Sequence, residues 1–247
     1  MPTSERASPE RANDERHRPL AADRRWLAGL AALLALMTIG VLATALLGSS
    51  VQTGVRAFVG GEGSWSKGQK NAVIHLQGYL ASGRQTDWDA YVSEVGVTLG
   101  DRNARLELEK PAADMAIVTA GFLAGGVAAD DIPAMAMVFR TFRHVSYIDR
   151  AIAIWTAGDA EIDRLNSLAM DIHAAVGQAG PNGDRATLDP LGTELQAANA
   201  SLTTLEGDFS RTLGEGARWV QTVLILVMGW ILAVLVAISA ILGRFMV

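Results

Sequence analysis

Two long uncharged apolar runs dominate the pattern of hydrophobic and polar positions along the chain. One extends from Trp26 to Val55 and the other from Trp219 to Gly243. About 20 apolar residues in a helix cross the hydrocarbon core of a bilayer. We therefore predict transmembrane helices over residues 26–48 and 219–243. The first run could instead be a cleaved signal peptide, but it is longer than the apolar part of such peptides, which favours a retained anchor.

Between these runs, apolar residues recur at helical spacing. The clearest example begins at Ser146, where Ile148, Ile152, Trp155, Ile162 and Leu165 fall on one face. A further stripe leads into the second apolar run, and we find no segment that indicates a strand. The pattern predicts an all-α protein: an up-and-down helical bundle over residues 49–218, flanked by two transmembrane helices.

Charge at the ends of the runs predicts the orientation. Residues 1–25 mix Arg with Asp and Glu without an apolar period, which is typical of a disordered tail. Arg24 and Arg25 flank the first run, so the positive-inside rule places this tail in the cytoplasm. With two spans, residues 49–218 lie outside and residues 244–247 form a second cytoplasmic end.

Composition then narrows the possible functions. The net charge of −5, with the acidic excess in the middle of the chain, argues against a nucleic-acid partner, whereas membrane lipid is an expected partner. No cysteine is present, which excludes disulfides and thiolate metal sites. The four histidines are scattered, and no nucleophile, P-loop or dinucleotide motif occurs. We expect no catalytic residue, no metal site and no cofactor in these residues.

The most unusual local stretch lies between Gly60 and Lys70, where charged residues and a tryptophan are interspersed with glycines. One interpretation is a ligand pocket in which Glu62, Lys67 and Lys70 fix a small polar molecule against the flat ring of Trp65. The other is a helix irregularity whose tryptophan packs in the core. Glycine allows either a close backbone approach or a helix break, and both interpretations stay open.

A second candidate ligand site is Arg140 and Arg143, next to His144 and a few turns from Asp130 and Asp131. A solvated helix face with local ion pairs is the favoured alternative. Trp155 and Asp159 lie one turn apart and offer another pocket wall, although core packing is the better interpretation for this tryptophan.

Small residues in both apolar runs favour close helix approach. They include Gly29, Ala32, Ala35 and Gly40 in the first run and Gly229 in the second. These positions suit a homodimer interface, or they reflect ordinary membrane composition.

Several stretches together resemble a family: VRAFVGGEGSWSKGQKNAVIHL, LGDRNARLELEKP, GFLAGG, DDIPAMAMVFRTFRHVSYIDRAIAIWTAGD and LEGDFSRTLGEGARWV. They resemble the periplasmic input region of bacterial membrane-bound signalling proteins, which precedes diguanylate cyclase (GGDEF) and phosphodiesterase (EAL) domains or a histidine kinase. The resemblance implies a dimeric helical sensor in the inner membrane, with a periplasmic central domain that passes a ligand-induced shift through its last helix.

The chain differs from this family in its output domain. No GGDEF, EAL or kinase motif follows Gly243, so any catalytic output is expected beyond residue 247. The alternative is a stand-alone membrane accessory or scaffold protein that binds another protein through its bundle.

Overall fold

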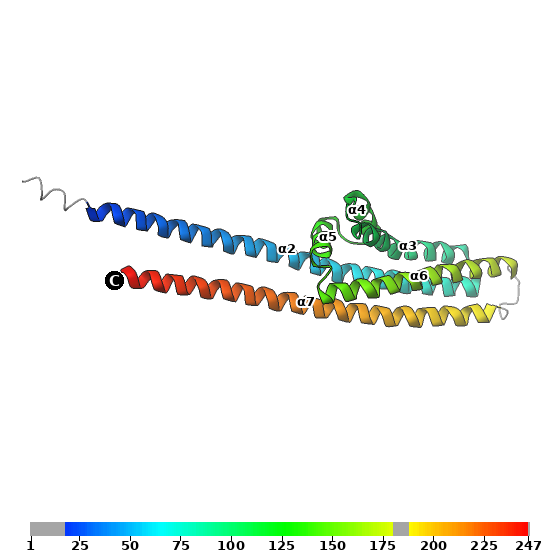
Figure 1. Ribbon diagram of the computed structural model, residues 1–247. Coiled ribbons are helices and arrows are strands. Elements are labelled where there is room, and N and C mark those ends of the chain that lie inside the picture. Colours follow the sequence, from blue (N-terminus) through cyan, green and yellow to red (C-terminus); the bar gives the residue numbers. More distant parts are fainter. Residues whose placement is uncertain (1–17, 180–187, 247) are drawn as a thin grey trace, which may run out of the picture. The chain divides into compact units, whose positions relative to one another are not determined.

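The structure is a computed structural model that describes residues 18–179 and 188–246, and these residues are almost entirely helical with no strand (Figure 1). The elements in chain order are α2 (Arg18–Ser82), α3 (Gln85–Leu108), α4 (Met115–Ala124), the 3-10 helix η1 (Ala129–Asp131), α5 (Ile132–Phe142), α6 (Ser146–Ala179) and α7 (Asp189–Met246). The prediction of an all-helical protein with two long apolar helices is confirmed.

The chain divides into two units, and α2 and α7 contribute to both. The first contains α2 up to Gly48 and α7 from Leu226, and the second extends from Ser49 to Ile225. Both helices contain a segment long and apolar enough to cross a membrane. Large apolar side chains in the first unit are exposed, among them Leu36 and Trp230. Such exposure is costly in water and favourable in lipid.

Helix α2 begins earlier than the apolar run. It starts at Arg18, within the segment 1–25 predicted as a disordered tail, and the rest of that segment lies outside the described residues. The sequence from Pro19 to Arg25 explains the correction, because a proline is well tolerated in a first helical turn and Leu, Ala and Arg are strong helix formers. At the other end, α7 remains helical to Met246.

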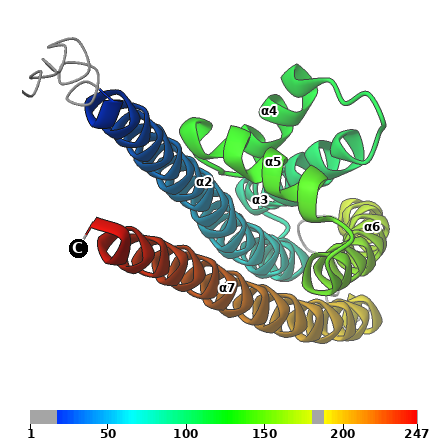
Figure 2. The ribbon, with the colours of Figure 1, turned by 60° about the vertical axis from the view of Figure 1, so that its left-hand side comes forward.

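In the second unit, successive long helices run in opposite directions. Ser66 of α2 contacts Glu206 of α7, and Leu80, further along α2, lies beside Gly192, which comes earlier in α7. The two helices are therefore antiparallel. The same reversal relates α3 to α6, where Tyr91 contacts Asn166 and Arg105 contacts Asp159. Figure 2 shows these helices from a second direction, with α4 and α5 on the side of α3.

The interior of this unit consists of two clusters of buried apolar side chains. Leu76, Leu165 and Leu202 belong to the first, and Phe122 and Phe139 to the second; all five are fully buried. Burial of each such side chain contributes about 1.5–3 kcal/mol. The helical stripes seen in the sequence therefore face one another in this core.

The glycine-rich stretch of α2 does not interrupt the helix. A Cβ atom built on Gly68 would lie 3.0 Å from the Cβ of Val97 and 3.1 Å from the carbonyl oxygen of Glu94, both on α3. Close backbone approach is therefore observed at Gly68, whereas a Cβ on Gly60 or Gly63 would meet nothing within 4 Å among the described residues.

Helices α3 and α4 also meet through glycine. A Cβ on Gly100 would lie 2.8 Å from the carbonyl oxygen of Gly121. Asp114 caps the start of α4 by accepting a hydrogen bond from the backbone N–H of Ala116, and the helix ends before Gly126, which has a φ of 84°. This arrangement holds α4 directly against the middle of α3.

Candidate functional site

A cluster of buried ionisable side chains lies in the interior of the bundle, formed by Asp101 and Arg105 from α3 and Asp159 from α6. Their exposed fractions are 3%, 3% and 4%. Transfer of charge from water to a protein interior is costly unless the group is paired or neutralised. The partners of these three residues therefore define the chemistry of this interior charged cluster.

Arg105 holds the cluster together. Its guanidinium donates hydrogen bonds to Oδ2 of Asp159 at 2.5 Å and to Oε1 of Glu109 at 2.7 Å. Its Cζ lies 5.9 Å from the centre of the Trp155 ring, within range of a cation–π interaction. Its Nε has no hydrogen-bond acceptor among the described residues. The charge of Arg105 is thus matched by two carboxylates.

Asp101 has no such cation. Its Oδ1 lacks a hydrogen-bond partner within the described chain, and its carboxyl packs so closely on Gly125 that a Cβ there would overlap it. Burial, and then the neighbouring carboxyl of Asp159, raise the pKa of Asp101 well above its usual value. Asp101 therefore favours its neutral form in the folded bundle.

The pKa values of the surrounding carboxyls differ in direction. Burial raises the pKa of Asp159, although hydrogen bonding to Arg105 opposes the effect. Burial, followed by the charge of Glu206, also raises the pKa of Glu62. Burial of Glu206 acts in the same sense, but hydrogen bonds from Lys70 and a neighbouring serine outweigh it and lower the pKa of Glu206.

A small cavity lies beside this cluster. It is lined by Phe58, Gly61, Glu62, Trp65, Asp101, Met135, Trp155 and Phe209, which come from α2, α3, α5, α6 and α7. It has about 10 Å³ of space for the centre of a water-sized molecule. A cavity of this size holds about one water or an ion of similar radius.

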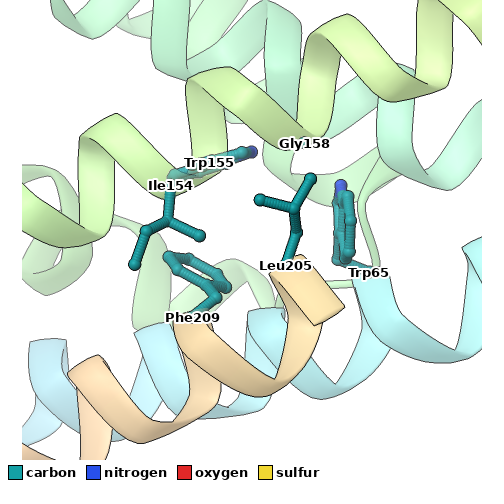
Figure 3. A pocket seen from close by; sticks show the side chains of 6 residues that line it. All are labelled: Trp65, Ile154, Trp155, Gly158, Leu205 and Phe209. Carbon is teal, nitrogen blue, oxygen red and sulfur yellow. The ribbon is translucent and has the colours of Figure 1, made fainter. Parts of the chain in front are cut away.

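A second cavity of about the same size shares Trp65, Trp155 and Phe209 with the first. Figure 3 shows Leu205 of α7 between the two tryptophan rings. The indole nitrogens of both tryptophans are buried, and neither has a hydrogen-bond acceptor in the described parts of the chain. Two donors and one carboxyl oxygen are therefore unpaired around these cavities, which is unusual in a folded core.

The residues of the predicted glycine-flanked site separate into two groups. Glu62 and Trp65 line the first cavity, and Trp65 belongs to the buried core. Lys67 and Lys70 are exposed on the surface of α2, and Lys70 donates a hydrogen bond to Oε1 of Glu206 at 2.7 Å. Ser66 donates a second, short hydrogen bond to the same oxygen.

The second predicted set is not brought together around a cavity. Arg140 is exposed and donates a hydrogen bond to the carbonyl oxygen of Pro111 at 3.0 Å. Arg143 is half-buried, and Asp131 pairs with Arg56 of α2 at 2.9 Å. Neither arginine lines the two small interior cavities.

Sequence reasoning missed the role of Asp101 and Arg105. The stretch GDRNARLELEK reads as a charged, solvated helix end, yet both residues share the helix face of Tyr91, Val95 and Leu108. Charges that fall on an apolar stripe are the signal that could have identified them.

Comparison with known proteins adds no assignment: no family model, no curated protein and no solved structure matches the chain. Within residues 18–179 and 188–246, no group of three or more histidine and carboxylate side chains is arranged to hold a metal ion.

Proposed function

We propose that the chain is the input module of a membrane-bound signalling system. In this proposal an up-and-down bundle, residues 49–218, lies in the periplasm of a bacterium, and residues 26–48 and 219–243 cross the inner membrane. The module senses a ligand or partner and biases a cytoplasmic output domain of the cyclic-di-GMP or histidine-kinase type. The family resemblance of the bundle sequence supports this choice of output.

One observation carries the proposal: α2 and α7 each continue as a single helix from the bundle residues into the apolar segment. A helix shifts as a unit because its hydrogen-bonded backbone resists compression, so displacement of its bundle part displaces its apolar part. Small helix shifts of this kind are an established way to transmit signals.

The contacts between α2 and α7 supply the element that a ligand can bias. Ser66 and Lys70 of α2 both bind Glu206 of α7, directly beside the cavity wall formed by Trp65. Sliding α7 along α2 by one helical turn breaks both contacts. A ligand that binds one arrangement more tightly shifts the population toward it.

Small residues in the apolar segments support a homodimer. A Cβ atom placed on Gly29 or Gly40 would meet no atom of another described helix within 4 Å, so these positions leave room for a second chain. Helix pairs in membranes associate through such small-residue faces.

A chimera tests the relay. The chain is fused through α7 to a diguanylate cyclase, and cyclic-di-GMP is measured for the parent and for Asp159→Asn. This substitution weakens the buried pair with Arg105 and should change output by several-fold. In a control chimera with four glycines inserted after Arg244, the same substitution should have no effect. Equal responses in the two chimeras would contradict transmission through α7.

A second candidate function, a scaffold that binds another protein, is favoured by an open groove between α3 and α4. Its walls include Leu106 and Ile117, both exposed, and the nearby Leu123 is exposed as well. Exposed apolar patches often mark protein interfaces. A photo-crosslinking residue at Ile117 distinguishes the functions, because a scaffold forms an adduct with a different protein in cells and a sensor that acts alone does not.

A further inference from the structure

The cavity beside the interior charged cluster combines aromatic rings with carboxyl groups. Four rings line it, those of Phe58, Trp65, Trp155 and Phe209, together with the carboxyls of Glu62 and Asp101. Aromatic faces attract cations through their negative π surface, and carboxylates add charge and hydrogen-bond acceptors. Walls of this composition are suited to a positively charged ligand.

The charges around the cavity are not balanced. Arg102 of α3 pairs with Asp163 of α6 close to the interior charged cluster. With this pair, the ionisable groups in and around the cluster are the cations Lys70, Arg102 and Arg105 and the carboxyls of Glu62, Asp101, Glu109, Asp159, Asp163 and Glu206. Each of these three cations pairs with a carboxylate other than Glu62 and Asp101. Within the described chain, the two carboxyls that line the cavity therefore lack a cation of their own.

We propose that this cavity binds a small ammonium ion, either ammonium itself or the head group of a short primary amine. The carboxyl groups of Asp101 and Glu62, which both line the cavity, each accept one N–H of this ion. The remaining N–H groups face the aromatic rings. This proposal rests on the proposed function, since it names the ligand class that the module senses.

Size and coordination favour ammonium over other cations. The space of about 10 Å³ admits an ion of the radius of water, whereas a quaternary ammonium is too large without rearrangement of Leu205 or Phe209. Metal cations of similar radius prefer six or more oxygen ligands. The cavity wall offers the oxygens of only two carboxyl side chains.

Protons compete with this ligand. Burial raises the pKa of both Asp101 and Glu62, so each carboxyl binds a proton more readily than usual. The charged groups that act on Glu62 are Lys70 from α2 and Glu206 from α7, and the one that acts on Asp101 is Asp159 from α6, which itself pairs with Arg105 from α3. The wall residue from α5, Met135, is uncharged. Ammonium affinity should consequently fall as the pH is lowered.

Binding is tested on the full chain in detergent micelles. Ammonium chloride and methylammonium chloride are titrated against it at constant ionic strength while tryptophan fluorescence and thermal stability are recorded. A saturable ammonium response is expected, with potassium at least about tenfold weaker. Glu62→Gln and Asp101→Asn should each weaken ammonium binding at least about tenfold, since each removes a carboxyl group that would carry the counter-charge of the bound ion.

Glu194→Gln is the matched control, because this carboxyl is exposed on α7 and should not affect binding. If Asp101→Asn fails to fold, Glu62→Gln decides the result, since Glu62 is only half-buried. The proposal is overturned by the absence of a saturable response, by equal responses to potassium and ammonium, or by unchanged binding in the variants. If ammonium does not bind while Asp159→Asn still changes the output of the chimera, only the ligand assignment is lost.

Discussion

Replacement of Arg105 by methionine should strongly destabilise the bundle. The guanidinium is 3% exposed and contacts Asp159, which is 4% exposed, at 2.5 Å. Removing it leaves a buried carboxylate without a cation, which typically costs about 3–5 kcal/mol. For a unit of the size of Ser49–Ile225, each kcal/mol lowers the melting temperature by about 2–4 °C, so the expected shift is about 6–20 °C.

The double variant Arg105→Met/Asp159→Leu separates the value of the pair from the cost of an unpaired charge. Buried ion pairs replaced by apolar residues of similar volume often leave stability unchanged or increase it. The double variant should therefore lie within about 1 kcal/mol of the parent, far from the sum of the two single losses.

Urea unfolding in detergent micelles, followed by circular dichroism, measures these free energies, and the melting temperature provides a parallel reading. The cost of Arg105→Met should also be smaller in mild acid than above neutral pH, because a protonated Asp159 needs no cation. A loss below about 1 kcal/mol for Arg105→Met, or a double variant that is as unstable as the summed singles, would refute the burial argument.

Three further predictions concern the bundle. The raised pKa of Asp101 means that the folded state holds a proton that the unfolded chain releases above about pH 4, so the free energy of unfolding should fall as the pH rises above this value. Asp101→Asn should reduce this slope, and the raised pKa values of Glu62 and Asp159 should account for the slope that remains. An unchanged slope would contradict the prediction. Gly100→Ala should lower the free energy of unfolding in urea by about 1–3 kcal/mol, because the new Cβ meets the α4 backbone. The control Gly96→Ala, on the same helix, meets nothing within 4 Å among the described residues and should be neutral or stabilising. Leu165→Ala, at a fully buried position, should lower the free energy of unfolding by about 2–5 kcal/mol, whereas Ile74→Ala, at an exposed position, should lower it by less than about 1 kcal/mol. Equal losses for the two variants would contradict the assigned core.

The sequence was sufficient to predict the helices and the two apolar segments, because both follow from local periodicity and length. Ile162 and Leu165 lie in the core as their stripe indicates. Helix α2 extends back to Arg18, into the segment predicted as a disordered tail, because mixed charges in a sequence do not exclude helix where good helix formers are present.

The candidate site could be predicted only in part. Trp65 and Glu62 share a cavity wall, but nothing local showed that α3 and α6 supply its other ionisable groups. The partners of Asp101 and Arg105 depend on which helices are neighbours, and a single sequence without a repeat does not specify these long-range pairings.

Topology is the most direct test of the central claim, that two apolar helices place the bundle on one side of the membrane and both chain ends on the other. Since the chain has no cysteine, single cysteines can be introduced as Ser4→Cys, Lys67→Cys and Val247→Cys and probed with an impermeant maleimide. In bacterial cells with a permeable outer membrane, only Lys67→Cys should be labelled, and the other two should react after the inner membrane is disrupted. Protection of Lys67→Cys, or opposite behaviour of the two ends, would contradict the account.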